Sequence, residues 1–73
     1  MNETATRAER FIKLPDVMAK VGLGRSSIYA KMKSGDFPKS IELSRSNVVW
    51  LESEIDHWIL EKVEQRNKKE HTK

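Results

Sequence analysis

The stretch from Pro15 to Lys33 constrains the fold of this chain most, because two apolar-striped segments flank a Gly-Leu-Gly turn there. Pro15 suits the first turn of a helix, where its missing N–H has no partner to lose. Val17 and Val21 follow one helical turn apart, as on the buried face of a helix. The pattern therefore predicts a first helix from Pro15 to Val21.

The turn itself predicts a second helix packed against the first. Gly22 is well placed to end the first helix in a left-handed conformation, and Gly24 is an acceptable cap for the next one. Ile28 and Met32 lie one turn apart on the expected inner face of a helix from Arg25 to about Lys33. Two short helices joined by a glycine-containing turn form a helix-turn-helix, whose second helix can enter the major groove of DNA.

Apolar residues on both sides of this unit are expected to complete its core. Phe11 or Ile12, together with Leu14, should form a short extended lead-in that closes over the core. Gly35 is a natural end for the second helix. Phe37 precedes a proline, which favours an extended backbone and leaves the ring free to pack inward.

The segment from Lys39 to Trp50 is typical of a β-hairpin. Polar and apolar residues alternate up to Leu43, a polar turn spans 44–47, and two valines precede Trp50. A hairpin after a helix-turn-helix would form a wing. The expected fold is therefore mainly α with a small β-hairpin wing, a winged helix-turn-helix.

A last helix is predicted from Leu51 to about Gln65, with an apolar stripe that includes Trp58 and ends near Val63. Ser53 and Asp56 also fit a capping box, which would start the helix two residues later. We expect one domain over residues 10–65, a flexible N-terminus over 1–9 and a basic flexible tail over 66–73.

Composition narrows the classes of function. The chain has 73 residues, a net charge of +3 and no cysteine, which excludes disulfides and thiolate metal sites. No apolar run is long enough to cross a membrane and no signal peptide is present, so a cytoplasmic protein is expected. His57 and His71 are the only histidines and lie at no metal-ligand spacing. We therefore expect no enzyme, no cofactor and no metal.

The outer face of the second predicted helix is the strongest functional feature. With Ile28 and Met32 inward, steps of about 100° per residue place small or basic residues outward. No acidic residue occurs from Gly24 to Lys33, which suits contact with phosphates and base edges, although a solvated face would look similar. The candidates on this helix are Arg25, Ser26, Ser27, Tyr29, Ala30 and Lys33, with Lys31 as a secondary phosphate contact.

The wing adds further candidate contacts. Arg45, Ser46 and Asn47 supply three hydrogen-bonding side chains at the predicted turn, which could reach the DNA backbone or a minor groove. Turns are commonly polar, so this feature alone is ambiguous. Lys39 is a further candidate for a phosphate contact. Trp50 and Trp58 are expected in the core rather than stacked on bases.

The motifs of the chain resemble the AlpA family of small phage and prophage regulators from Arg10 to about Leu60. The shared marks are Leu14-x-x-Val17, Gly22-Leu23-x-Arg25-Ser26-Ser27-Ile28-Tyr29, Met32-Lys33-x-Gly35-x-Phe37-Pro38, Val49-Trp50 and Ser53-Glu54-Ile55-Asp56-x-Trp58-Ile59. Gly24 departs from the family pattern, which often has serine there as the helix cap. The second helix therefore lacks a cap hydrogen bond from a side chain.

The resemblance implies a MerR-like winged helix-turn-helix and a transcriptional regulator of a phage or mobile element. Together with the residues above, it predicts a sequence-specific protein that binds double-stranded DNA, in bacteria and on the nucleoid. A domain this small would need a homodimer or several copies on DNA for useful affinity. Two alternatives stay open: an excisionase-type protein that bends DNA for recombination, and a protein-interaction module that antagonises another regulator.

Overall fold

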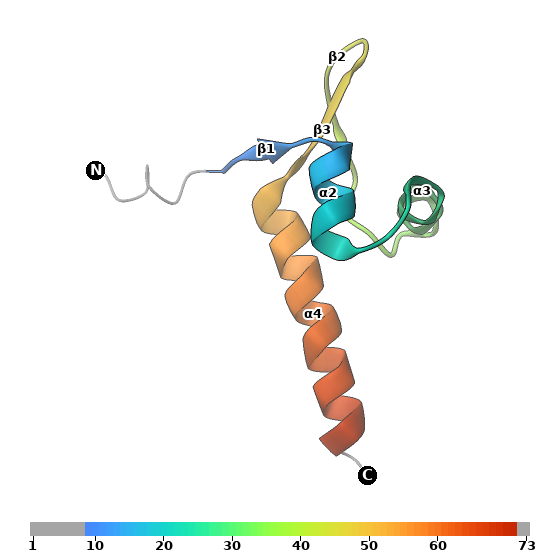
Figure 1. Ribbon diagram of the computed structural model, residues 1–73, viewed down its shortest axis with the longest axis vertical. Coiled ribbons are helices and arrows are strands. Elements are labelled where there is room, and N and C mark those ends of the chain that lie inside the picture. Colours follow the sequence, from blue (N-terminus) through green and yellow to red (C-terminus); the bar gives the residue numbers. More distant parts are fainter. Residues whose placement is uncertain (1–8, 72–73) are drawn as a thin grey trace, which may run out of the picture.

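The computed structural model describes residues 9–71, and for 69–71 the backbone alone. Its elements are, in chain order, β1 (Phe11–Ile12), α2 (Leu14–Val21), α3 (Arg25–Ser34), β2 (Ile41–Ser44), β3 (Asn47–Leu51) and α4 (Glu52–His71) (Figure 1). Helices α2 and α3 form the predicted helix-turn-helix, and β2 and β3 form the predicted wing. The winged helix-turn-helix is confirmed. No helix in this part of the chain combines the length and apolar character needed to span a bilayer.

Two glycines end the first two helices as predicted. Gly22 has φ 72° and donates its N–H to the Met18 carbonyl at 2.8 Å. Gly35 has φ 85° and ends α3 in the same left-handed conformation, which other residues adopt at a cost. Gly24 is the N-cap of α3 and provides no side-chain hydrogen bond, as expected.

The core lies between the helices and one face of the sheet. Val17, Ile28 and Ile55 are fully buried and come from α2, α3 and α4, respectively. Trp50 of β3 is also fully buried, and its indole N–H donates to the Pro38 carbonyl at 3.1 Å, which satisfies the one polar atom of the ring. Phe37 packs inward, as predicted.

The sheet contains one strand more than the sequence predicted. Residues Phe11–Ile12 form β1, which pairs antiparallel with β3, so the strand order is β1-β3-β2. Ile12, opposite Trp50, is the lead-in residue that is buried, whereas Phe11 is half-exposed. A two-residue strand is too short to show an alternating pattern, because one step cannot be told from chance.

The last helix differs from its prediction at both ends. Leu51 is the final residue of β3, and α4 runs from Glu52 to His71 rather than to Gln65. The start after Ser53 is also wrong, because Ser53 is already helical and its hydroxyl donates to Glu9. Val63 is exposed rather than buried.

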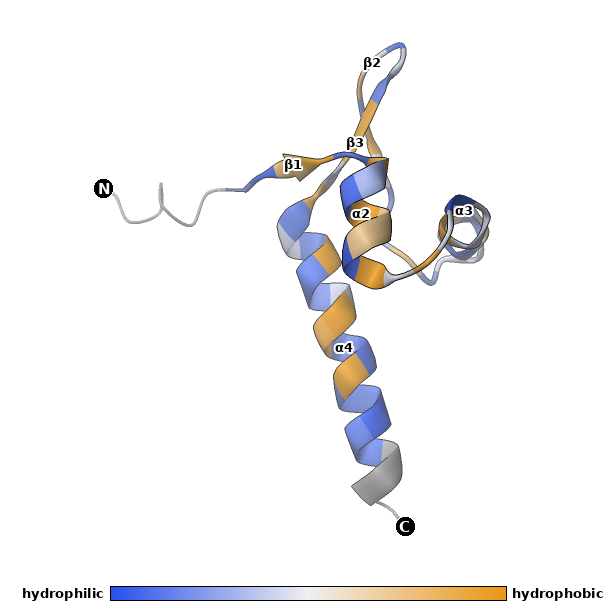
Figure 2. Ribbon diagram, viewed as in Figure 1, coloured by the Kyte–Doolittle hydropathy of each residue, from blue (hydrophilic) through white to orange (hydrophobic). Residues whose placement is uncertain are grey.

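The predicted flexible tail therefore continues as helix through residues 66–71. The segment contains no glycine or proline, and its arginine, lysine and glutamate residues favour helix without burial. Figure 2 shows that hydrophilic residues dominate the outer part of α4 up to the point where the ribbon becomes grey. Residues 72–73, and residues 1–8 of the predicted flexible N-terminus, lie outside the described residues.

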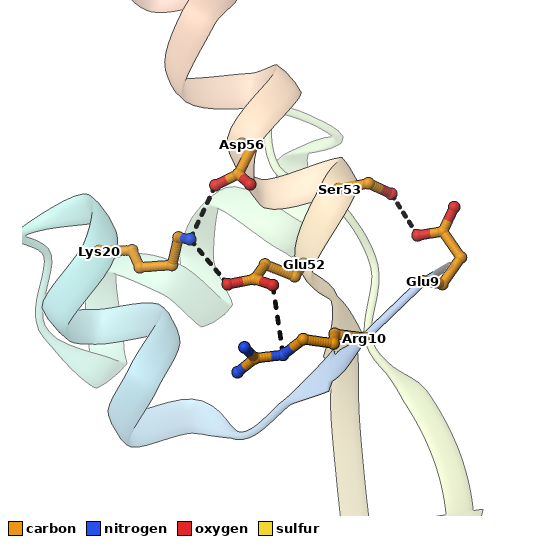
Figure 3. A network of polar contacts seen from close by, with 6 residues as sticks. All are labelled: Glu9, Arg10, Lys20, Glu52, Ser53 and Asp56. Carbon is orange, nitrogen blue, oxygen red and sulfur yellow. Dashed lines mark hydrogen bonds and ion pairs between the residues drawn. The ribbon is translucent and has the colours of Figure 1, made fainter. Parts of the chain in front are cut away.

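A polar cluster joins α2 to the start of α4 (Figure 3). Lys20 of α2 contacts Asp56 at 2.9 Å and Glu52 at 3.0 Å, and Arg10 reaches the other oxygen of Glu52 at 3.4 Å. Hydrogen bonds to Asp56 and Glu52 raise the pKa of Lys20 above its usual value. This cluster orients α2, and with it the turn that leads to α3.

Candidate nucleic-acid interface

Helix α3 presents a continuous exposed surface without acidic residues. Ile28 is fully buried and Met32 packs against the core, so the opposite side of the helix faces solvent. All of the outward positions predicted from the sequence are exposed, namely Arg25, Ser26, Ser27, Ala30 and Lys33. Small side chains at three of these positions allow the backbone of a nucleic acid to approach closely.

Tyr29 lies at the edge of this surface and is tied to the sheet. Its ring is 44 % exposed, and its centroid lies 6.4 Å from that of Trp50 at an angle of 56°. The aromatic contact fixes the ring against β3 and leaves one side open. The open side can therefore receive a sugar or phosphate beside α3.

The C-terminal end of α3 is attached to α4 through Asp36. The Asp36 carboxylate accepts a hydrogen bond from Lys62 at 3.3 Å, and its backbone carbonyl accepts one from the Trp58 indole at 2.8 Å. Lys62 also lies 5.3 Å from the centre of the Trp58 ring, and Phe37 packs edge-on against that ring. The hydrogen bond and charge of Lys62 lower the pKa of Asp36 below its usual value.

This attachment was missed from the sequence. Asp36 and Lys62 are 26 residues apart, and no local pattern links them. Trp58 was expected in the core; it packs against the core but is only half-buried, because it also forms the contact between α4 and the end of α3. Its indole hydrogen bond connects α4 to the residues that follow α3.

Lys31 of α3 also contacts the Asp36 carboxylate. Its ammonium lies 3.5 Å from the Asp36 carboxylate, and its side chain is half-buried. Of the lysines on α3, Lys33 is therefore freer than Lys31 to contact an external group, and Lys31 would have to share its ammonium group with Asp36.

A shallow hollow brings two separate candidates together. It is lined by Tyr29, Met32 and Lys33 of α3 and by Lys39 and Ser40 of the segment that leads to β2. Lys33 and Lys39 are both exposed, so the hollow carries two ammonium groups with no carboxylate in its lining. Its two positive charges suit the acceptor groups of a nucleic acid, phosphate oxygens or base edges.

The wing tip is a two-residue turn between β2 and β3, and Ser44 lies opposite Asn47. Arg45 and Ser46 are exposed at this tip, as predicted. Asn47 does not lie at the tip as predicted, because it is the first residue of β3 and is half-buried. Its Oδ1 is shielded from solvent and has no hydrogen-bond partner in the described structure. Arg45 is thus the principal donor of the wing.

The basic side chains fall into two groups by their partners. Arg10, Lys20, Lys31 and Lys62 form ion pairs with carboxylates. Among the side chains of residues 9–68, no ion pair involves the exposed bases of α3, the hollow or the wing tip, which are Arg25, Lys33, Lys39 and Arg45. The same residues contain no cluster of three side chains suited to hold a metal ion.

Comparison with known proteins places this surface in context. The family model described as prophage CP4-57 regulatory protein (AlpA) matches residues 10–63. A protein of enterobacteria phage P4, ORF88, is 40% identical over 60 residues, which cover 82% of this chain and 68% of that one. The DNA-binding transcriptional activator AlpA of Escherichia coli K12 is 36% identical over 58 residues, covering 71% of this chain and 83% of that one. No solved structure matches the chain significantly.

Proposed function

The chain belongs to the AlpA family, and on that premise we propose that it is a transcriptional regulator that binds duplex DNA in a sequence-specific manner. The observation that carries the proposal is the exposed, acid-free face of α3, together with exposed bases that form no ion pair among the side chains of residues 9–68, namely Arg25, Lys33, Lys39 and Arg45. The prophage description of the family and the relative in phage P4 support a role in a phage or another mobile element. Such a regulator acts on DNA in the bacterial cytoplasm.

In this proposal α3 lies in the major groove. Ser26, Ala30 and Lys33 face the base edges, because they project from the middle of its exposed surface. The remaining candidates meet sugar and phosphate and fix the register, namely Arg25, Ser27, Tyr29, Lys31 and Lys39 from the HTH side and Arg45, Ser46 and Asn47 from the wing.

The first test is the dependence of affinity on salt. If roughly three to five phosphates are neutralised, log K should fall with log salt with a slope of about −3 to −4.5. The duplex is obtained by selection from a random pool, and its affinity is measured by fluorescence anisotropy at several salt concentrations. Failure to select any sequence, or a flat salt response, would remove DNA as the partner.

Two variants distinguish a side chain that recognises bases from one that positions the protein on the DNA backbone. Lys33→Ala should change the preferred base at one or two positions, by about 1–3 kcal/mol, because a base-edge contact is lost. Arg45→Ala should weaken all duplexes alike and reduce the salt slope by about one unit. Both side chains are exposed, so both variants should keep the wild-type melting temperature. If Arg45→Ala changes the preferred sequence and Lys33→Ala does not, the reading element is the wing rather than α3.

One domain of this size offers a limited surface to DNA. A single small module buries about 600–1,000 Å² on DNA, less than most specific complexes. We therefore infer that two or more copies bind adjacent or inverted half-sites. Selected sequences should then contain a repeated half-site, and a single half-site should bind much more weakly.

A further inference from the structure

The wing contains an irregularity beside its tip. Glu42 of β2 lies opposite Val48, but Ser44 lies opposite Asn47, so β2 has one residue more than β3 between these pairs. The extra residue is Leu43. A β-bulge of this kind bends the strand and redirects the side chain of the inserted residue.

Leu43 makes no contribution to the core. Its side chain is 48 % exposed, and it is absent from the apolar residues that pack around the buried cluster. The residues that follow it, Ser44, Arg45 and Ser46, are all exposed and polar. A single exposed leucine is ordinary on a protein surface. Leu43, however, is the inserted residue of the bulge and lies two positions before Arg45, the principal cation of the wing.

We propose that Leu43 is an apolar wedge with which the wing enters the minor groove of duplex DNA and partly unstacks a base step. This inference rests on the proposed function. The narrow minor groove attracts arginine through its negative potential, and proteins that bind there insert apolar side chains between base pairs. Arg45 and Leu43 supply these two features on one projecting hairpin (Figure 1).

The charge distribution limits how deep the hairpin can go. Glu42 immediately precedes Leu43, is exposed and is repelled by phosphates. From Leu43 to Ser46 the hairpin carries no acidic residue. Only the tip, with Leu43 at its boundary, is therefore suited to the groove.

The test compares two half-exposed leucines. Leu43→Ala should bind the selected duplex about tenfold more weakly, since burial of part of a leucine side chain is lost. Its salt slope should equal that of the wild type, because no charge changes, and the DNA bend measured by phased electrophoresis should be smaller. Leu60→Ala, on α4 and 55 % exposed, should match the wild type in affinity and bend. Leu43→Thr retains strand propensity and should behave like Leu43→Ala.

The outcomes are distinct. If the wild-type protein binds no duplex with a salt-dependent affinity, the proposed function fails. If the wild type binds but Leu43→Ala and Leu43→Thr keep its affinity and bend, the wedge is wrong. The wedge is also wrong if these variants change the oligomeric state seen by light scattering and leave the bend unchanged, since Leu43 would then contact a second copy of the chain.

Discussion

Arg10 and Lys20 lie beside the start of α4 and both contact Glu52, whereas Arg25 and Lys33 on α3 have no carboxylate partner among the side chains of residues 9–68. The two sets have the same charge and all four residues are exposed, but only the second can offer its charge to an external anion without losing an internal contact. The chain has 14 lysines and arginines against 11 acidic residues. This small excess of basic over acidic residues understates how basic the surface of α3 is, because the acidic residues are concentrated on α4.

The largest effect should come from the core beneath both regions. Trp50→Ala should destabilise the fold by about 3–5 kcal/mol, because a large, fully buried ring leaves a cavity. Urea unfolding followed by circular dichroism measures the loss, and DNA binding should disappear with the fold. Trp58→Ala removes a half-buried ring and should cost less. Equal losses for the two variants would show that the contact between α4 and the end of α3 matters as much as the core.

A matched pair of arginines tests the comparison directly. Arg25→Ala should weaken DNA binding about tenfold and reduce the salt slope by about one unit, because one phosphate contact is lost. Arg10→Ala removes the same charge from the side chain paired with Glu52 and should leave the slope unchanged. Anisotropy titrations at three salt concentrations distinguish the two. If both variants reduce the slope equally, ion pairing does not decide which bases bind DNA.

The smallest effect concerns the ion pair that attaches α4 to the end of α3. Lys62 lowers the pKa of Asp36, so the ionised carboxylate stabilises the folded protein above the usual aspartate value of about 3.9, and this contribution is lost as the pH falls through the lowered pKa. Asp36→Asn should therefore melt slightly below the wild type at pH 7, and the difference should shrink below about pH 4. Calorimetry from pH 7 to 3 measures it. If Asp36→Asn melts like the wild type at every pH, the role of Asp36 lies in its backbone carbonyl, which asparagine retains.

Local signals in the sequence were sufficient to predict the helix-turn-helix. Gly22 and Gly35 mark helix ends because the left-handed conformation favours glycine, and this preference depends on no distant residue. Ile28 and the outward face of α3 follow from helical spacing alone. Trp50 was placed in the core because a tryptophan at the end of a β-branched strand is rarely left exposed.

Contacts between distant segments could not be predicted in this way. The pairing of β1 with β3 joins residues about forty positions apart and has no periodic signal of its own. The end of α4 was predicted too early because the prediction followed the apolar stripe, which ends near Val63. The helix continues to His71 because the residues beyond the stripe still favour a helical conformation. The contact of Lys31 with Asp36 and the bulge at Leu43 arise only when the chain is folded. The roles of the site residues in DNA binding stay predictions.

The outer half of α4 has a practical consequence for experiments on this protein. The C-terminal end of the helix and the tip of the wing lie at opposite ends of the longest axis in Figure 1, and α3 lies beside the middle of the molecule. A dye, an affinity tag or a surface linkage placed after His71 is therefore held away from the face proposed to meet DNA. Immobilisation through this end should preserve the kinetics of association measured in solution, whereas a probe on the wing tip would report on the bound groove itself.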